Sequence, residues 1–198
     1  MTEQALTRHG LENFVRSASA NDASIQLTIR ADLGHINLRG DSGNADFVAA
    51  VELTLGQPLP LNPNTVSNGS HSILWLGPNE WLILSRLTGA SKTVADISRA
   101  TGDFHSAVND LSGGQIAISM SGKGVRELLA RGCTLDLHPR KFGPGMCAQS
   151  GLAKAAVLVA VPDEDGEFLL VVRRSFSDYL VSWLIDAADG PGIRVKNS

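Results

Sequence analysis

The sequence predicts an α+β fold in which two similar βαββα halves share one hydrophobic core. Short apolar runs with the alternation of strands lie between segments whose apolar residues recur at helical spacing. The order of these segments repeats after about 80–90 residues, so that Gly40 corresponds to Gly122. The chain has 198 residues, of which 43% are hydrophobic, and this is enough for one core built by both halves.

The first half, residues 25–103, follows a loosely held N-terminal arm, residues 1–24, in which the periodicity is weak. Two alternating strands open it, and apolar residues at every fourth position up to Gly56 then predict a helix with a glycine stop. Three prolines within residues 56–71 argue against regular structure there. A hairpin follows, and Ser91 is the expected N-cap of the closing helix. The predicted strands are residues 25–29, 36–38, 72–76 and 81–85. The first predicted helix contains Phe47, Val51 and Leu55, and the second contains Val94 and Ile97.

The second half, residues 104–190, repeats this order and ends in the clearest helix of the chain. Six apolar residues there fall at i, i+3, i+4, i+7, i+8 and i+11, and Ser175 with Asp178 forms a start signal in the style of a capping box. We expect residues 191–198 to form a C-terminal tail. The predicted strands are residues 116–120, 157–161 and 168–172, the shorter helix contains Val125, Leu128 and Leu129, and the long helix contains Phe176 to Ala187.

Charge and composition exclude several classes of function. Lys and Arg number 17 against 20 Asp and Glu, a net charge of −3, whereas nucleic-acid binders usually carry a basic excess or stripe. The longest apolar run, residues 152–161, is about half of the roughly 20 residues that span a membrane. The first residues lack the layout of a signal peptide, and two cysteines are too few for a disulfide framework. We therefore expect a cytoplasmic protein that binds neither nucleic acid nor membrane.

A turn with two glycines, Gly122-Lys123-Gly124, follows a predicted strand and opens a helix, as in dinucleotide-binding folds. Glu127 occupies the place of the third glycine, where it would crowd the helix against the sheet and repel a pyrophosphate. No acidic residue follows about 20 positions later at the end of a second parallel strand. We interpret the motif as a strand-to-helix turn that binds no cofactor.

The remaining motifs indicate neither a metal site nor a catalytic group. Cys133 and Cys147 lie far apart in the chain, and with His138 they would leave a zinc ion one ligand short of its usual four. None of the five histidines lies in a recognisable nucleophile motif. Cys147 lies in a Gly-rich loop, and a hydrolase or transferase that uses it as a nucleophile ranks last among the hypotheses. The prediction is a chain with no catalytic residue and no metal.

Three segments taken together resemble the gamma subunit of heterotetrameric bacterial sarcosine oxidase. They are LGPNEWLIL at residues 76–84, the stretch 109–149 that includes GCTLDLHPR, and VVRRSFSDYLVSWL at residues 171–184. The resemblance extends from about Ile25 to Ala188 with the same order and similar spacing. It implies a fold like that of the folate-binding domain of the glycine cleavage system T-protein, the aminomethyltransferase, which agrees with the two halves.

The resemblance further implies that this chain is a non-catalytic component of a flavoenzyme complex. That complex demethylates sarcosine oxidatively to glycine, transfers the one-carbon unit to tetrahydrofolate or releases it as formaldehyde, and makes hydrogen peroxide. Its FAD, FMN and NAD lie with the alpha and beta subunits, and its delta subunit carries zinc. The implied partners of this chain are the alpha, beta and delta subunits, and the chain itself is expected to bind no cofactor.

The alternative hypothesis is a stand-alone folate- or pterin-binding module. A pterin needs an apolar or aromatic slot and a carboxylate for its N–H donors, which Glu80 beside Trp81, or else Glu127, would supply. Folate-binding relatives of this fold often carry a signature resembling K-G-C-Y-x-G-Q, whereas residues 143–149 lack the tyrosine and differ in order around the cysteine. The residues expected to contact partner subunits are His138, Arg140, Arg173 and Arg174.

Overall fold

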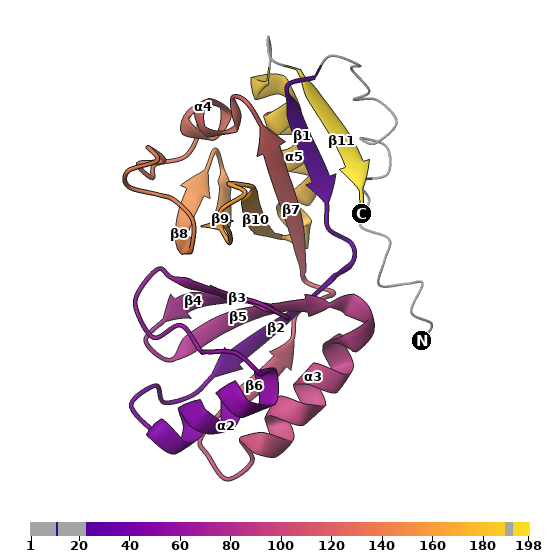
Figure 1. The fold of residues 1–198 in the computed structure, drawn as a ribbon. Coiled ribbons are helices and arrows are strands. Elements are labelled where there is room, and N and C mark those ends of the chain that lie inside the picture. Colours follow the sequence, from indigo (N-terminus) through magenta and orange to yellow (C-terminus); the bar gives the residue numbers. More distant parts are fainter. Residues whose placement is uncertain (1–10, 12–22, 189–191) are drawn as a thin grey trace.

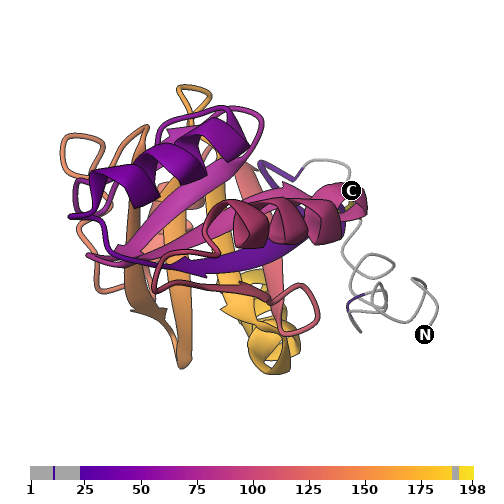
Figure 2. The ribbon, with the colours of Figure 1, turned by 90° about the horizontal axis from the view of Figure 1, so that it is seen from below.

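Two β-sheets pack against each other, and helices cover the outer face of each (Figure 1). The computed structural model describes Leu11, residues 23–188 and residues 192–198. Strands of the two sheets cross at a steep angle, which Figure 2 shows from the side of α2 (Ala45–Leu55) and α3 (Leu87–Ala100). The predicted α+β class with two halves is confirmed.

The first sheet has five antiparallel strands within the described residues, in the order β3-β4-β5-β2-β6. Its centre is the predicted hairpin of β4 and β5, in which Trp75 and Trp81 lie opposite each other. Residues 56–71, where we expected no regular structure, include the three-residue strand β3, which pairs with β4. The strands are β2 (Leu33–Arg39), β3 (Val66–Asn68), β4 (Ser72–Gly77), β5 (Glu80–Arg86) and β6 (Ala107–Asp110).

Helices α2 and α3 cover this sheet, and α2 ends at Gly56 as predicted. The Asn44 side chain accepts hydrogen bonds from the backbone N–H groups of Asp46 and Phe47, and Gly56 ends α2 with a φ of 68°. The prediction of Ser91 as the N-cap of α3 is wrong, because the helix begins at Leu87, directly after β5. No side chain caps it; the N–H of Leu87 donates instead to the carbonyl of Asp32 at 2.7 Å.

The second sheet has six strands within the described residues, in the order β11-β1-β7-β10-β9-β8. The apolar run at 152–161 is split by a turn, where Ala153 has a φ of 52°, so that its first residue ends one strand and the rest forms the next. The strands are β1 (Ile25–Ile29), β7 (Gln115–Gly122), β8 (Met146–Leu152), β9 (Ala155–Val161), β10 (Phe168–Arg173) and β11 (Ile193–Asn197).

Helices α4 (Val125–Ala130) and α5 (Ser177–Ala187) cover the outer face of the second sheet. The predicted apolar stripe of α5 is confirmed in part, since Leu180 and Leu184 are buried but Tyr179 is exposed. The capping box expected from Ser175 and Asp178 is absent. A short 3-10 helix, η2 (Arg174–Phe176), leads into α5, and the Ser177 hydroxyl donates to the carbonyl of Arg174 at 2.8 Å.

The strand order agrees with the predicted repeat. The order β3-β4-β5-β2-β6 corresponds to β8-β9-β10-β7-β1, and β11 is an additional strand at the edge of the second sheet. β1 pairs antiparallel with β7 and parallel with β11, although it belongs to the predicted half 25–103. β6 lies in the predicted half 104–190 but pairs with β2 of the first sheet. The two sheets therefore exchange strands across the predicted boundary.

The prediction of a C-terminal tail at residues 191–198 is wrong in part, because residues 193–197 form β11. Ile193 and Val195 are buried against the core, and pairing with β1 turns this short alternation into a strand. Of the predicted N-terminal arm, Leu11 is buried in the same core and residues 23 and 24 are described. The rest of the arm lies outside the described residues.

The core divides into three clusters according to which face of a sheet a residue occupies. Alternate residues of a strand point to opposite faces, so Val157, Val159 and Val161 of β9 pack under the helices, whereas Leu158 and Ala160 face the other sheet. One cluster lies under α4 and α5, and a second lies under α2 and α3. The third joins the two sheets and is the part of the core that both halves share.

Candidate functional site

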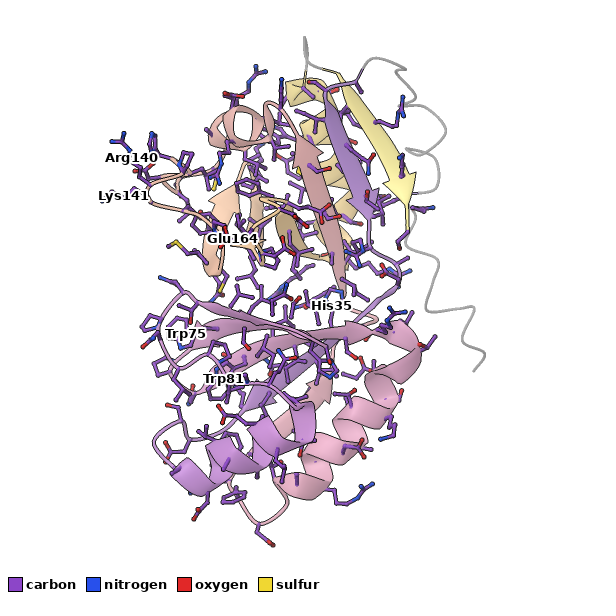
Figure 3. The ribbon with its side chains drawn as sticks, viewed as in Figure 1. His35, Trp75, Trp81, Arg140, Lys141 and Glu164 are labelled. Carbon is purple, nitrogen blue, oxygen red and sulfur yellow. The ribbon has the colours of Figure 1, made fainter. Side chains whose placement is uncertain are left out.

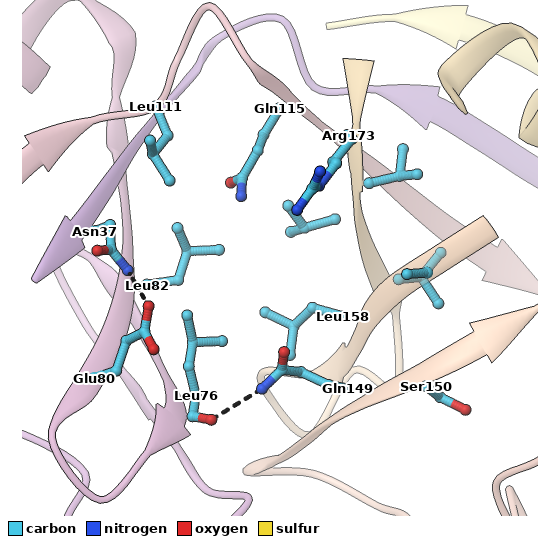
Figure 4. A pocket seen from close by; sticks show the side chains of 14 residues that line it. Asn37, Leu76, Glu80, Leu82, Leu111, Gln115, Gln149, Ser150, Leu158 and Arg173 are labelled. Atoms are coloured by element: carbon cyan, nitrogen blue, oxygen red, sulfur yellow. Dashed lines mark hydrogen bonds between the residues drawn. The ribbon is translucent and has the colours of Figure 1, made fainter. Parts of the chain in front are cut away.

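A cleft of about 360 Å³ opens where the two sheets diverge, and we call it the inter-sheet cleft (Figure 4). Its walls come from β2, β4 and β5 on one side and from β8, β9 and β10 on the other. The inner surface is apolar, and amide and charged groups surround it. The apolar side chains include Leu76, Leu82, Leu111, Leu158 and Val171, and the polar residues are Asn37, Glu80, Gln115, Gln149, Ser150 and Arg173.

Glu80 is held on the first-sheet wall of the cleft. It is the first residue of β5, directly after the hairpin turn, and is paired in register with Arg39 of β2. Its carboxylate accepts a hydrogen bond from Asn37 Nδ2 at 2.9 Å and from Arg39 Nη2 at 2.8 Å. These contacts come from the neighbouring strand and keep the carboxylate, 27% exposed, at the wall of the cleft.

Arg173 and Gln149 belong to the opposite wall. Gln149 of β8 donates through Nε2 to the carbonyl of Leu76 at 2.9 Å and so connects the two sheets. Arg173 is the last residue of β10 and is exposed; its side chain makes no ion pair or hydrogen bond with the described residues. The fold therefore places Glu80 and Arg173, which are far apart in the sequence, on opposite walls of one cleft, and the sequence alone did not indicate this.

His35 lies buried behind the cleft, between the two sheets (Figure 3). Its Nδ1 lies 3.2 Å from Oε1 of Gln115, and its backbone N–H donates to the Ser112 hydroxyl at 3.0 Å. Burial lowers the pKa of His35 from 6.5 to about 4, and the contact with Gln115 and the charge of Asp110 only partly oppose this. The ring is therefore neutral at pH 7.

We expect the stability of the chain to fall as the pH decreases from 6.5 to 4. In this range the unfolded chain binds a proton at His35 and the folded chain does not, so acid favours unfolding. The full loss is about 3 kcal/mol of unfolding free energy. Denaturant unfolding at several pH values measures it. The pKa of His71 is also lowered by burial, so His35→Gln isolates the effect of His35; an unchanged pH dependence in this variant would contradict the assignment.

The other two residues considered for a pterin lie away from the cleft. Trp81 is fully buried on the opposite face of β5, where it packs near Phe47 and donates through Nε1 to the carbonyl of Pro60 at 2.8 Å. Glu127 is exposed in the first turn of α4, and α4 covers the outer face of the second sheet, away from the cleft. Of the three, the structure brings only Glu80 to the cleft.

The cysteines occupy structural positions. Cys147 is fully buried between the sheets, its thiol directed at the carbonyls of Thr65 and Trp75 at 3.3 and 3.5 Å, and burial raises its pKa to about 11. Cys133 contacts Ser150 instead, at 3.6 Å. Within the described residues, no three His, Cys, Asp or Glu side chains gather closely enough to hold a metal ion. A protonated, enclosed thiol is a poor nucleophile.

The turn Gly122-Lys123-Gly124 needs its glycines for backbone reasons. Gly122 has a φ of 109° and Gly124 a φ of 96°, conformations that other residues rarely adopt. A Cβ on Gly122 would lie 2.1 Å from the carbonyl oxygen of Ser24, just before β1. The first glycine therefore permits the close approach of β1 to β7, which explains the motif without a bound nucleotide.

The residues expected at a partner interface lie on three segments. His138 and Arg140 are exposed in the loop after α4, and Arg173 is at the cleft. Arg174 is half-buried at the start of η2. The described helices include none that is both long and apolar enough to cross a membrane.

Comparison with known proteins identifies the family. The family model described as "Sarcosine oxidase, gamma subunit family" matches residues 39–190. The chain belongs to this family. The sarcosine oxidase subunit gamma of Corynebacterium sp. strain P-1 is 32% identical over 90% of this chain and 86% of its own length. That of an Arthrobacter species is 30% identical over 82% of this chain and 77% of its own length.

Solved structures agree with membership of the sarcosine oxidase gamma family. A chain of the heterotetrameric sarcosine oxidase from Corynebacterium sp. U-96, in complex with pyrrole 2-carboxylate, matches with a TM-score of 0.82 and 28% identity, covering 92% of this chain and 93% of that one. The aminomethyltransferase T of Bartonella henselae matches with a TM-score of 0.63 and 13% identity, covering 88% of this chain and 48% of that one. The second match confirms the expected fold of this gamma subunit.

Proposed function

We propose that this gamma subunit is a non-catalytic component of a heterotetrameric sarcosine oxidase. The observation that carries the proposal is the match of 92% of the chain, with a TM-score of 0.82, to a chain of such an enzyme. Similarity in both fold and sequence, with 28% identity over almost the whole length, favours the same position in an assembly, because the match includes most of the residues that could contact partners. In this proposal the chain contributes contact surface and no reacting group.

Cysteine and histidine are often catalytic in other proteins, but the contacts of Cys147 and His35 in this chain are structural. This supports the proposal that the chain contributes no reacting group. The Cys147 thiol is protonated and enclosed by backbone carbonyls. His35 is neutral and packed between the sheets. The glycine turn at 122–124 serves strand packing. The fold itself thus explains the positions of these three groups.

In the proposed assembly, the alpha, beta and delta subunits hold the FAD, FMN, NAD and zinc, and the complex works in the cytoplasm. It demethylates sarcosine oxidatively to glycine, and the one-carbon unit leaves as formaldehyde or methylene-tetrahydrofolate while hydrogen peroxide forms. The gamma subunit supports this reaction by holding the larger subunits in place.

Purification of the tagged chain from its own host tests the proposal. We expect a yellow complex with three further subunits, identified by mass, that oxidises sarcosine, whereas the isolated chain is colourless and gives only background turnover. A complex carrying Cys147→Ala should keep its turnover, because the thiol takes no part in the chemistry. A colourless monomer from the host, or sarcosine turnover by the isolated chain, would overturn the proposal.

A further inference from the structure

The loop between α4 and β8 presents an exposed positive charge on a firmly anchored segment. Four consecutive exposed residues, 138–141, form what we call the basic loop, and it includes Arg140 and Lys141. The residues on either side of it, Leu137 and Phe142, are each 4% exposed and belong to the core. The segment is therefore fixed at both ends, unlike most surface loops.

Arg126 of α4 holds the base of the basic loop. Its Nη1 donates to the carbonyl of Leu137 at 2.6 Å and to that of Phe142 at 2.9 Å. The guanidinium lies 4.8 Å from the centre of the Phe168 ring, on which Phe142 stacks with centroids 6.4 Å apart. One side chain thus joins both ends of the basic loop to the second sheet.

Local hydrogen bonds hold the conformation of the basic loop itself. The backbone N–H groups of Lys141 and Phe142 donate to the carbonyl of His138 at 2.8 and 3.0 Å. The backbone N–H of His138 donates to the Asp136 carboxylate at 3.0 Å, and that of Arg140 donates to the His138 ring at 3.2 Å. The conformation of the exposed residues is set before any partner arrives, which reduces the entropy lost on binding.

The charges of this loop have no partners in the described chain. The side chains of Arg140 and Lys141 make no ion pair or hydrogen bond with the described residues, and Figure 3 shows both pointing away from the body of the molecule. No acidic residue occurs between positions 137 and 146, and Asp136, which directly precedes this stretch in the sequence, accepts a backbone hydrogen bond. Neighbouring like charges repel each other, and an opposite charge brought by a partner would relieve this repulsion.

We propose that the basic loop is a docking site for an acidic surface on a neighbouring subunit; this rests on the proposed function above. Two cations are too few for a membrane, where clusters of about four to eight are usual. They are also too few for nucleic acid, because the chain carries a net charge of −3 and binding of that kind neutralises many phosphates. A protein surface with two or more carboxylates matches the charge and the rigidity of the loop.

The test compares capture of the other sarcosine oxidase subunits, identified by mass, by tagged variants co-expressed with them. Arg140→Glu with Lys141→Glu should reduce the affinity for the complex by about tenfold or more, and the wild-type interaction should weaken as salt increases. The matched control, Lys92→Glu with Arg99→Glu on the exposed face of α3, changes the net charge equally and should stay within about twofold. The swap Arg140→Lys with Lys141→Arg should also keep its affinity. Thermal melts verify folding of each isolated chain.

The outcomes separate the two proposals. If the wild-type chain captures the subunits and the charge-reversed loop captures them equally well, the docking site is wrong and the proposed function stands. An equal loss in the α3 control would attribute the effect to net charge and would also overturn the docking site. If the wild-type chain captures none of the subunits, the proposed function fails, and the docking site with it.

Discussion

Replacing Trp81 with alanine will lower the free energy of unfolding by about 3–5 kcal/mol, the usual cost of removing a large aromatic side chain from a core. The indole is fully buried between β5 and the helices, near Phe47. Removal also leaves the carbonyl of Pro60 without its hydrogen bond from Nε1. Denaturant unfolding monitored by far-UV circular dichroism measures the loss.

Trp81→Phe is the matched variant, because it keeps an aromatic ring and removes the indole N–H. We expect a smaller destabilisation, about 1–3 kcal/mol, from the unpaired carbonyl and the reduced volume. A Trp81→Ala chain as stable as the wild type would contradict the structural role. It would reopen the alternative in which this residue contacts a ligand.

Gly122→Ala will destabilise the chain by about 3 kcal/mol or more through two causes that add. The φ of 109° strains any residue with a Cβ, and the added carbon would lie 2.1 Å from the carbonyl oxygen of Ser24. A backbone atom cannot move aside as the end of a flexible side chain can. Because Gly122 pairs with Ile25, the damage should be concentrated in β1, where faster amide hydrogen exchange would reveal it.

Gly89→Ala provides the control. This glycine lies within α3, a Cβ there meets no atom within 4 Å, and its φ is not positive. Alanine is the better helix former, so the chain should gain about 0.5–1 kcal/mol of stability. Equal effects of the two substitutions would show that the close approach of β1 to β7 does not explain the glycine at position 122.

The inter-sheet cleft depends on how the two sheets pack against each other. Glu80 is the first residue of β5 in the first sheet, and Arg173 is the last residue of β10 in the second sheet. The sequence does not indicate that the two residues line the same cleft. The packing of Leu82 and Leu158 between the sheets brings their walls together. The presence of both residues in one cleft therefore depends on sheet packing, which periodicity does not encode.

Both central hairpins and most helical segments were predictable, because their signals lie within the segments themselves. The strands of each hairpin are joined by a short turn, and Phe47, Val51 and Leu55 recur at the helical period up to a glycine with a φ of 68°. Helix starts were less predictable. Ser91 and Ser175 have the chemistry of caps, but the chain enters both helices directly from a strand or a 3-10 turn, and backbone groups supply the contacts there.

By itself, the sequence determined the α+β class, the repeated order of elements and the absence of a recognisable catalytic motif, because alternation and spacing are local properties. Only the tertiary structure decided that β1 enters the second sheet, that β6 joins the first and that residues 193–197 form a strand. The alternation of β1 predicts a strand but not the sheet that it joins, whereas the edge strands β6 and β11, with four and five residues, are too short for a distinctive pattern. They form because a partner strand satisfies their backbone hydrogen bonds and the core covers one face.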